Sequence, residues 1–160
     1  MQYLDFEIAH YVSEKIKIFS KSRNVYIYYN DKKVIISFPF KLWDFFNFSR
    51  TFRRFLRTDK CNVFLISDYP LQLVLIRQGE VFHYNQYNGL KRTLKLKNCR
   101  NLMHVDICKS KNGFLFFGEY GANNDRIEVP IYKSSDKGVS WDVVYEFPKN
   151  SIKHIHCIKE

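Results

Sequence analysis

The stretch that decides the fold is Ser-Ser-Asp-Lys-Gly-Val-Ser-Trp, residues 134–141. Its spacing is S-x-D-x-G-x-x-W, with Ser134, Asp136, Gly138 and Trp141 at the four fixed positions. In a tight link between strands, Ser and Asp side chains bond to nearby backbone amides and Gly supplies a positive φ. The indole ring of a Trp at this place packs under the turn. The stretch therefore predicts a β-hairpin that joins a strand at 129–133 to one at 141–147.

Short apolar runs separated by polar links extend outward from this hairpin. The links contain turn residues such as Gln78-Gly79, Asn88-Gly89 and Asn112-Gly113. Many short strands at regular spacing predict an all-β fold. The first 24 residues leave two alternatives open, a helical stripe or two short strands. The expected strands cover residues 25–29, 33–38, 62–66, 72–77, 80–84, 90–97, 102–108, 114–120, 129–133, 141–147 and 152–158.

An internal repeat indicates how these strands are grouped. Residues 102–109, LMHVDICK, align with residues 152–159, IKHIHCIK, at an offset of 50 residues. A period of this size is typical of propeller blades made of four strands. We therefore expect one blade at 61–100 and a second at 101–148, with 150–160 as the first strand of an incomplete blade. Residues 1–60 form an ill-defined N-terminal portion that is assigned to neither blade.

The stretch at 134–141 resembles the Asp-box of sialidase-like β-propellers, also called the bacterial neuraminidase repeat. Gly118-Glu119-Tyr120 and His154-Ile155-His156 extend the resemblance to the broader group of neuraminidase-repeat proteins, best over residues 101–160. The resemblance implies an all-β, partial β-propeller of four-stranded antiparallel blades within a single domain at 1–160. It also implies descent from glycan-binding or glycoside-hydrolysing proteins, with carbohydrate as the expected partner. Sialidases hold their substrate with three arginines that cannot be placed in this sequence, so we expect no catalysis by this chain alone.

Two strands of the repeat carry candidate metal ligands. Period-two alternation places His104 and Asp106 on one face of the first strand, and His154 and His156 on the equivalent face of the second. If the strands are the innermost ones of neighbouring blades, the four side chains cluster. Three imidazoles and a carboxylate suit a divalent first-row metal, and a His beside an Asp suits general-base catalysis. Alternatively, the four side chains bond only to water and to one another. No other cofactor is expected.

A second candidate site follows the strand at 114–120. Glu119, Tyr120, Asn123 and Arg126 can bond sugar hydroxyls or a carboxylate, because binding residues gather in loops after rigid strands. The catalytic candidates are Glu119, Asp106 and His156. Glu119 and Tyr120 are neighbours in an extended strand and point to opposite faces, so they cannot form a nucleophile-and-base couple. Turn formation alone also explains the loop.

Residues 42–57 break the strand pattern, with apolar residues at a helical period that predict a short amphipathic helix. Four arginines lie in this range, Arg50, Arg53, Arg54 and Arg57. The formal charge of +10 arises from 26 basic and 16 acidic residues. A cationic contact with RNA or a membrane is one interpretation, but we favour solvated arginines and do not expect a nucleic-acid partner.

The remaining composition sets limits on the class of protein. Cys61, Cys99, Cys108 and Cys157 are far apart and predict free thiols. The sequence has no secretory signal and no apolar run long enough for a membrane helix, so we expect a cytoplasmic protein. A lone strand at 152–158 would leave an apolar edge open, which predicts either further blades in a longer parent chain or self-association. A non-catalytic binding or scaffold module and a basic nucleic-acid-binding protein are the alternative functions.

Overall fold

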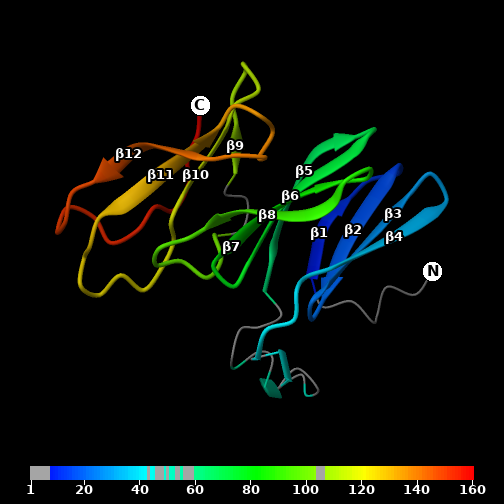
Figure 1. Cartoon of the computed structure of the whole chain (residues 1–160), viewed down its shortest axis with the longest axis horizontal. Helices are drawn as coiled ribbons and strands as arrows, with labels where there is room; N and C mark the ends of the chain where they lie inside the picture. The colour runs from blue at the N-terminus through cyan, green and yellow to red at the C-terminus, as the bar shows by residue number, and fades with distance from the viewer. Residues whose placement is uncertain are drawn as a thin grey trace. The chain divides into compact units, whose positions relative to one another are not determined.

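The computed structural model describes residues 8–42, 44–45, 49, 51–52, 55, 60–103 and 107–160. Within these ranges the chain is all-β and forms three four-stranded antiparallel sheets (Figure 1). In every sheet the strands follow one another in chain order, so each strand pairs only with its sequence neighbours. The chain divides into two compact units, residues 1–61 and 62–160. The expected all-β class and its four-stranded antiparallel sheets are therefore confirmed.

The N-terminal sheet belongs to the first unit and shows that residues 8–24 form strands rather than a helical stripe. Its strands are β1 (Ile8–Val12), β2 (Ile16–Lys21), β3 (Asn24–Tyr29) and β4 (Lys32–Ser37). A two-residue turn at Asn30-Asp31 joins β3 to β4, with positive φ at both residues. This conformation matches the right-handed twist of the flanking strands, and Asn and Asp tolerate it well.

The middle sheet opens the second unit. It consists of β5 (Asn62–Asp68), β6 (Leu71–Arg77), β7 (Glu80–Asn85) and β8 (Gly89–Lys95). Strand β6 is almost continuously apolar and is buried on both of its faces. Each of the four strands overlaps a range expected from the sequence.

The C-terminal sheet completes the second unit and contains the 134–141 turn. Its strands are β9 (Cys108–Lys109), β10 (Leu115–Gly118), β11 (Val129–Ser134) and β12 (Asp142–Phe147). The turn connects the third strand to the fourth, where the sequence places it. The exposed outer strand β12 pairs with β11 across a β-bulge between Ile131 and Tyr132.

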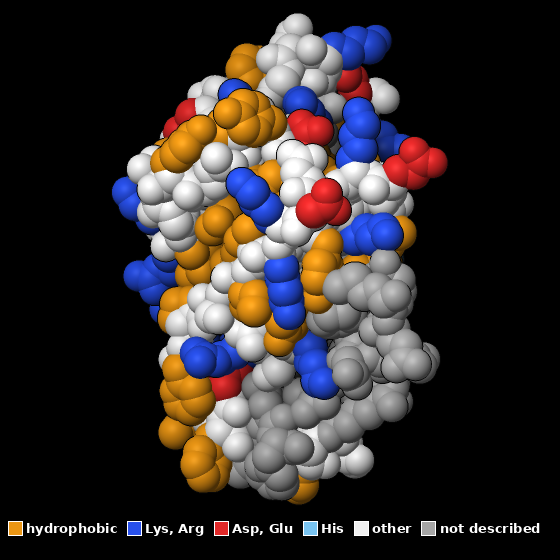
Figure 2. Space-filling view, turned by 90° about the vertical axis from the view of Figure 1, so that its right-hand side faces the viewer, with side chains coloured by type: hydrophobic (Ala, Val, Ile, Leu, Met, Phe, Trp, Pro, Cys, Tyr) orange, Lys and Arg blue, Asp and Glu red, His pale blue; other side chains and the backbone are white. Residues whose placement is uncertain are grey.

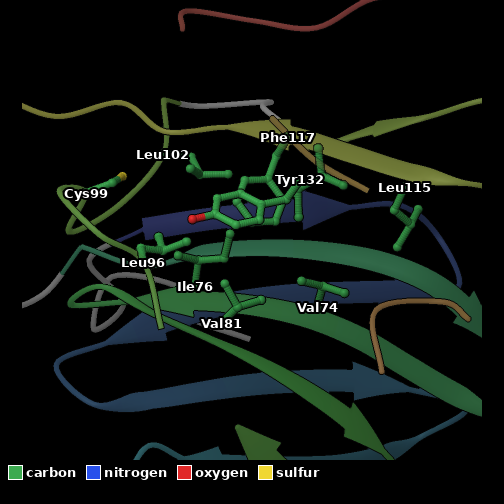
Figure 3. Close-up of a cluster of buried hydrophobic side chains, with 10 residues drawn as sticks. Val74, Ile76, Val81, Leu96, Cys99, Leu102, Leu115, Phe117 and Tyr132 are labelled. Atoms are coloured by element: carbon green, nitrogen blue, oxygen red, sulfur yellow. The ribbon is translucent and has the colours of Figure 1, made fainter. Parts of the chain in front are cut away.

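An apolar core lies between the middle and C-terminal sheets. In Figure 3, side chains from β6 and β7 point toward side chains from β10 and β11. Both Phe117 and Ile76 are 0% exposed, so their side chains are completely removed from water. Full burial of such side chains contributes about 1.5–3 kcal/mol each. The described members of the core are Val74, Ile76, Val81, Leu96, Cys99, Leu102, Ile107, Leu115, Phe117 and Tyr132.

The strand expected at 102–108 differs from the structure at its first residues. Of the described residues in this range, Leu102, Met103 and Ile107 lie outside any strand, and β9 begins at Cys108. The side chain of Asn62 explains the difference, because it donates to the carbonyl oxygens of Leu102 and Met103 and accepts from the amide of Leu102. These backbone groups therefore bond to a side chain instead of a strand ladder.

The prediction of a strand at 152–158 is wrong. These residues have irregular backbone, although the amide of Ile155 donates a hydrogen bond to the carbonyl oxygen of Glu119 at 3.0 Å. The side chain of Ile155 lies against Gly118, where any Cβ would collide with it. The alternation of His and Ile is the pattern of a strand, but a strand also requires a ladder of backbone hydrogen bonds to a neighbouring strand. The single hydrogen bond of Ile155 does not form such a ladder.

The helix expected at 42–57 lies largely outside the described residues. Within the range, Leu42, Asp44 and Phe45 form a 3₁₀ turn, and Thr51, Phe52 and Phe55 have helical backbone. No helix can be delimited from these residues. The four arginines of the predicted basic helix face also lie outside the described part of the chain.

Candidate functional site

Glu119, one of the three catalytic candidates, is buried just after the end of β10, with 4% of its surface exposed. Its oxygen Oε1 accepts from the amide of Lys97 at 2.8 Å and from the Tyr132 hydroxyl at 2.9 Å. Its oxygen Oε2 accepts from the amide of Asn98 at 2.9 Å. The carboxylate therefore ties the segment after β8 to strands β10 and β11.

Tyr132 is the partner that sequence reasoning missed. Burial, together with the charge of Glu119 and the hydrogen bond to it, raises the pKa of the Tyr132 phenol well above its usual range. The phenol therefore stays protonated and donates a hydrogen bond to the carboxylate. No motif signals this pair, because Tyr132 comes from the next strand and faces Glu119 only once β10 and β11 are paired.

The space beside Glu119 is too small for a sugar. A cavity of about 10 Å³ lies there, lined in part by Asn98, Asn123 and Lys153. This volume is close to the minimum that holds one water molecule. Gly121, which also lines the cavity, lies so close to the carbonyl oxygen of Asn98 that a Cβ would overlap it.

The other expected ligand residues of the loop fall into two groups. The side chain of Asn123 is buried and bonds both the amide and the carbonyl oxygen of Ile127 at 2.9 Å, which closes the loop on itself. Tyr120 is half-buried and packs against two histidine rings. Arg126 is exposed and has a positive φ of 45°. Only Arg126 of the four is presented to solvent.

His154 and His156 come together, although they lie in irregular backbone and not in the strand from which their shared face was predicted. Their Nε2 atoms are 2.9 Å apart, and the ring of Tyr120 packs against both imidazoles, 4.4 Å and 5.4 Å between centroids. The carbonyl oxygen of Gly121, 3.2 Å from Nδ1 of His154, can only accept. This assigns a proton to Nδ1 of His154 and, in the neutral ring, leaves its Nε2 to accept from His156.

His104 and Asp106, the other two candidate metal ligands, lie outside the described residues. Within the ranges that the structure describes, no group of three or more His, Cys, Asp or Glu side chains is arranged to hold a metal ion. The described part of the predicted cluster is therefore the pair His154 and His156.

The turn at 134–141 is held by side-chain hydrogen bonds. Ser134 Oγ accepts from the amide of Gly138 at 2.7 Å and donates to Asp136 at 2.8 Å. The Asp136 carboxylate also accepts from the amide and the hydroxyl of Ser140, at 2.9 Å and 2.6 Å. Burial opposes ionisation of Asp136, but the hydrogen bonds from Ser140 and Ser134 outweigh it and lower its pKa. Gly138 has a φ of +89°, as the sequence predicts for this turn.

The same turn fastens the C-terminal sheet to the middle sheet. The indole of Trp141 packs edge-on against Phe117, 4.7 Å between centroids, and its Nε1 donates to Thr93 of β8 at 3.3 Å. Gly138 lies against Val74 of β6, where a Cβ would overlap the valine methyl. The expected packing of Trp141 under the turn is confirmed, and the contacts with Thr93 and Val74 give the turn a structural role between sheets.

A groove in the first unit was not expected from the sequence. It has a volume of about 620 Å³ and lies at one end of the N-terminal sheet, around the β1–β2 and β3–β4 turns. Sequence reasoning missed it because the first 24 residues did not resolve into strands. Most of its lining is basic or aromatic: Lys15, Lys17, Lys32, Lys33, Tyr28 and Tyr29.

No family model, curated protein or solved structure matches this chain. The described residues also include no helix with the length and apolar character that crossing a bilayer would require.

Proposed function

We propose that this chain is a non-catalytic binding module built from propeller-type blades similar to those of sialidase-like proteins. Three features support the blade assignment. Each sheet is a four-stranded meander in chain order, two successive sheets pack face to face, and a turn with Asp-box spacing joins the third and fourth strands of the last sheet. Such sheets, arranged radially, are the repeating units of β-propellers.

The state of Glu119 carries the functional part of the proposal. A glycosidase needs a carboxyl group that reaches the glycosidic oxygen or the anomeric carbon of a bound sugar. Both carboxylate oxygens of Glu119 instead accept hydrogen bonds from three donors within the protein. The cavity beside them has a volume of about 10 Å³. The residue that resembles a catalytic acid is therefore assigned a structural role.

Hydrolysis of a panel of aryl glycosides, compared between the parent chain and Glu119→Gln, tests this proposal. We expect no chromophore release from either protein. We also expect urea denaturation to show that Glu119→Gln loses about 1–3 kcal/mol, because an amide cannot accept from all three donors. Release by the parent that disappears in a Glu119→Gln variant of unchanged stability would overturn the proposal.

The pair of histidines supports a second candidate function, binding of a divalent metal by His154 and His156. Two imidazole nitrogens 2.9 Å apart match adjacent ligands about 2.05 Å from one metal at a right angle, the tetragonal geometry typical of Cu²⁺ or Ni²⁺. The Gly121 carbonyl oxygen bonded to Nδ1 of His154 resembles the outer-shell contacts that orient metal-binding imidazoles.

Metal analysis by inductively coupled plasma spectrometry, after equilibration with Cu²⁺ and dialysis, tests this candidate. We expect the parent chain to retain one equivalent and the double variant His154→Ala, His156→Ala to retain none. Equal metal content in both proteins would rule this pair out as the site.

A further inference from the structure

The N-terminal sheet has two faces of different chemistry. On one face, β2 and β3 present side chains that are 0–4% exposed, among them Ile16, Ile18 and Ile27. The intervening residues belong to the opposite face, since successive side chains of a strand alternate. That opposite face, here called the Lys–Tyr face, is made of Lys17, Phe19, Tyr26, Tyr28, Lys33 and Ile35.

Strand register arranges the Lys–Tyr face in rows. Tyr28 pairs with Lys17 of β2 on one side and with Lys33 of β4 on the other, so a tyrosine lies between two lysines in the strand register. The Lys33 Nζ is 5.7 Å from the centroid of Tyr28 and 5.4 Å from that of Tyr26. Both distances are within the range of cation–π attraction. In the next row, Tyr26 pairs with Phe19, which is buried with 6% of its surface exposed, and with Ile35, which is 51% exposed. The ring of Phe19 therefore supports the row from below and does not itself contact a ligand.

The large groove continues the Lys–Tyr face at its end. Of the residues that line it, four are lysines and two are carboxylates, Glu14 and Asp31 in the two turns, which leaves the lining positively charged. On the surface shown in Figure 2, lysine and arginine side chains are interspersed with hydrophobic ones. The charge of +10 for the whole chain adds a long-range attraction for polyanions.

We propose that the Lys–Tyr face and its groove bind single-stranded nucleic acid. Lysines beside the rings neutralise phosphates, and tyrosine rings offer surfaces on which unpaired bases stack. The rings of Tyr26 and Tyr28 favour this ligand over a sulfated polysaccharide, which needs only charge. A face made of paired strands favours it over a membrane, which is bound by protruding apolar helices or anchors.

This inference names a partner for the binding module proposed above and rests on that function only in assuming that the chain binds a ligand. Its assay is independent of the glycoside assay, so either proposal can fail without the other. Fluorescence anisotropy of the full chain with a labelled oligouridylate of about 12 nucleotides measures the affinity. Repeating the titration from about 50 to 200 mM salt measures the charge contribution.

Three variants separate the contributions to binding. We expect Lys17→Gln, Lys33→Gln to weaken binding and to reduce the salt slope by about 1.4, since each phosphate contact on a single strand contributes about 0.7. We expect Tyr28→Ala to weaken binding about tenfold and Tyr28→Phe to retain it, because phenylalanine keeps the stacking ring. The matched control Lys149→Gln, Lys159→Gln removes two exposed lysines of the second unit and should bind like the parent.

The outcomes that overturn the proposal are distinct. Absence of oligonucleotide binding by the folded parent overturns it. So does equal binding by Tyr28→Ala and the parent with equally effective competition by dextran sulfate, which would identify a general polyanion surface. Binding to phosphatidylserine vesicles but not to the oligonucleotide would identify a membrane surface instead. Circular dichroism of each variant confirms that a lost signal is a loss of binding in a folded protein.

Discussion

At the scale of single residues, His83 of β7 is a titratable side chain that is buried in the fold. It is 9% exposed, and its Nε2 has no hydrogen-bond partner among the residues that the structure describes. Burial lowers the pKa of the imidazole, and the nearby carboxylate of Asp136 only partly offsets this effect. The folded chain therefore holds His83 neutral under conditions in which an exposed histidine takes up a proton.

The predicted consequence is a loss of stability in mild acid. The pKa of His83 in the unfolded chain is near the ordinary value of 6.5, and in the folded chain it is lower. As the pH falls below 6.5, the unfolded state binds the proton first, so the free energy of unfolding decreases until the folded pKa is passed. One proton gives a slope of at most about 1.4 kcal/mol per pH unit.

Urea denaturation between about pH 7.5 and 5 measures this slope, since histidine titrates in that range. His83→Phe should flatten the slope relative to the parent. Identical slopes in the two proteins would contradict the assignment to His83.

Single residues also show which contacts could not be predicted from the sequence. Alternation along a strand was the basis for placing Glu119 and Tyr120 on opposite faces, but β10 ends at Gly118, before both residues. The bond between Glu119 and Tyr132 could not be predicted, because it depends on the register of two strands. The contact between His154 and His156 does not follow from alternation either, since these residues lie in irregular backbone.

At the scale of elements, the turn at 134–141 connects the C-terminal sheet to the middle sheet through direct contacts. Gly138 meets two demands, a φ of +89° and the close approach of Val74 from β6. Gly113, in the turn before β10, has a similar φ of +83° but nothing within 4 Å of its Cβ position. Comparing substitutions at the two glycines therefore distinguishes the cost of backbone strain from the cost of disturbing the contact between sheets.

We expect Gly113→Ala to cost about 1 kcal/mol, which is the backbone strain alone. Gly138→Ala should cost about 1–3 kcal/mol more, because the added methyl group overpacks the contact with Val74. Urea denaturation of both variants measures the difference. Equal losses would show that the sheet contact is loose enough to accept a methyl group.

Elements were predicted best where turn chemistry marks both ends of a strand. Gln78-Gly79 and Asn88-Gly89 delimit β7 and β8 closely, and the 134–141 stretch delimits β11 and β12. Failure came where a segment has strand-like alternation without turns or partners, as at 152–158. At 102–103 the sequence could not reveal that a distant side chain, Asn62, would bind the backbone.

At the scale of the whole molecule, the chain is two compact units, and the core described here belongs to the second. Every described member of that core lies between Val74 and Tyr132. The bonds of Glu119, the Trp141–Thr93 bond and the 134–141 turn also lie within residues 62–160. A unit that contains its own core and the polar bonds that close it is expected to fold alone.

We therefore predict that residues 62–160, expressed alone, give a cooperative urea transition and the β-type circular dichroism of the full chain. The isolated fragment should retain the effect of Gly138→Ala, which provides an internal control for native packing. A fragment that unfolds without a cooperative transition would show that residues 1–61 are needed to complete the fold.

The meander order of the sheets also has a kinetic consequence. Each ladder joins strands that are adjacent in sequence, so a sheet can form by successive zipping of hairpins, with little loop-closure entropy opposing each step. The Trp141–Thr93 bond joins residues 48 positions apart and requires two sheets to exist already. Docking of sheet on sheet is then the late event, and the burial of Trp141 would time it in a stopped-flow fluorescence experiment.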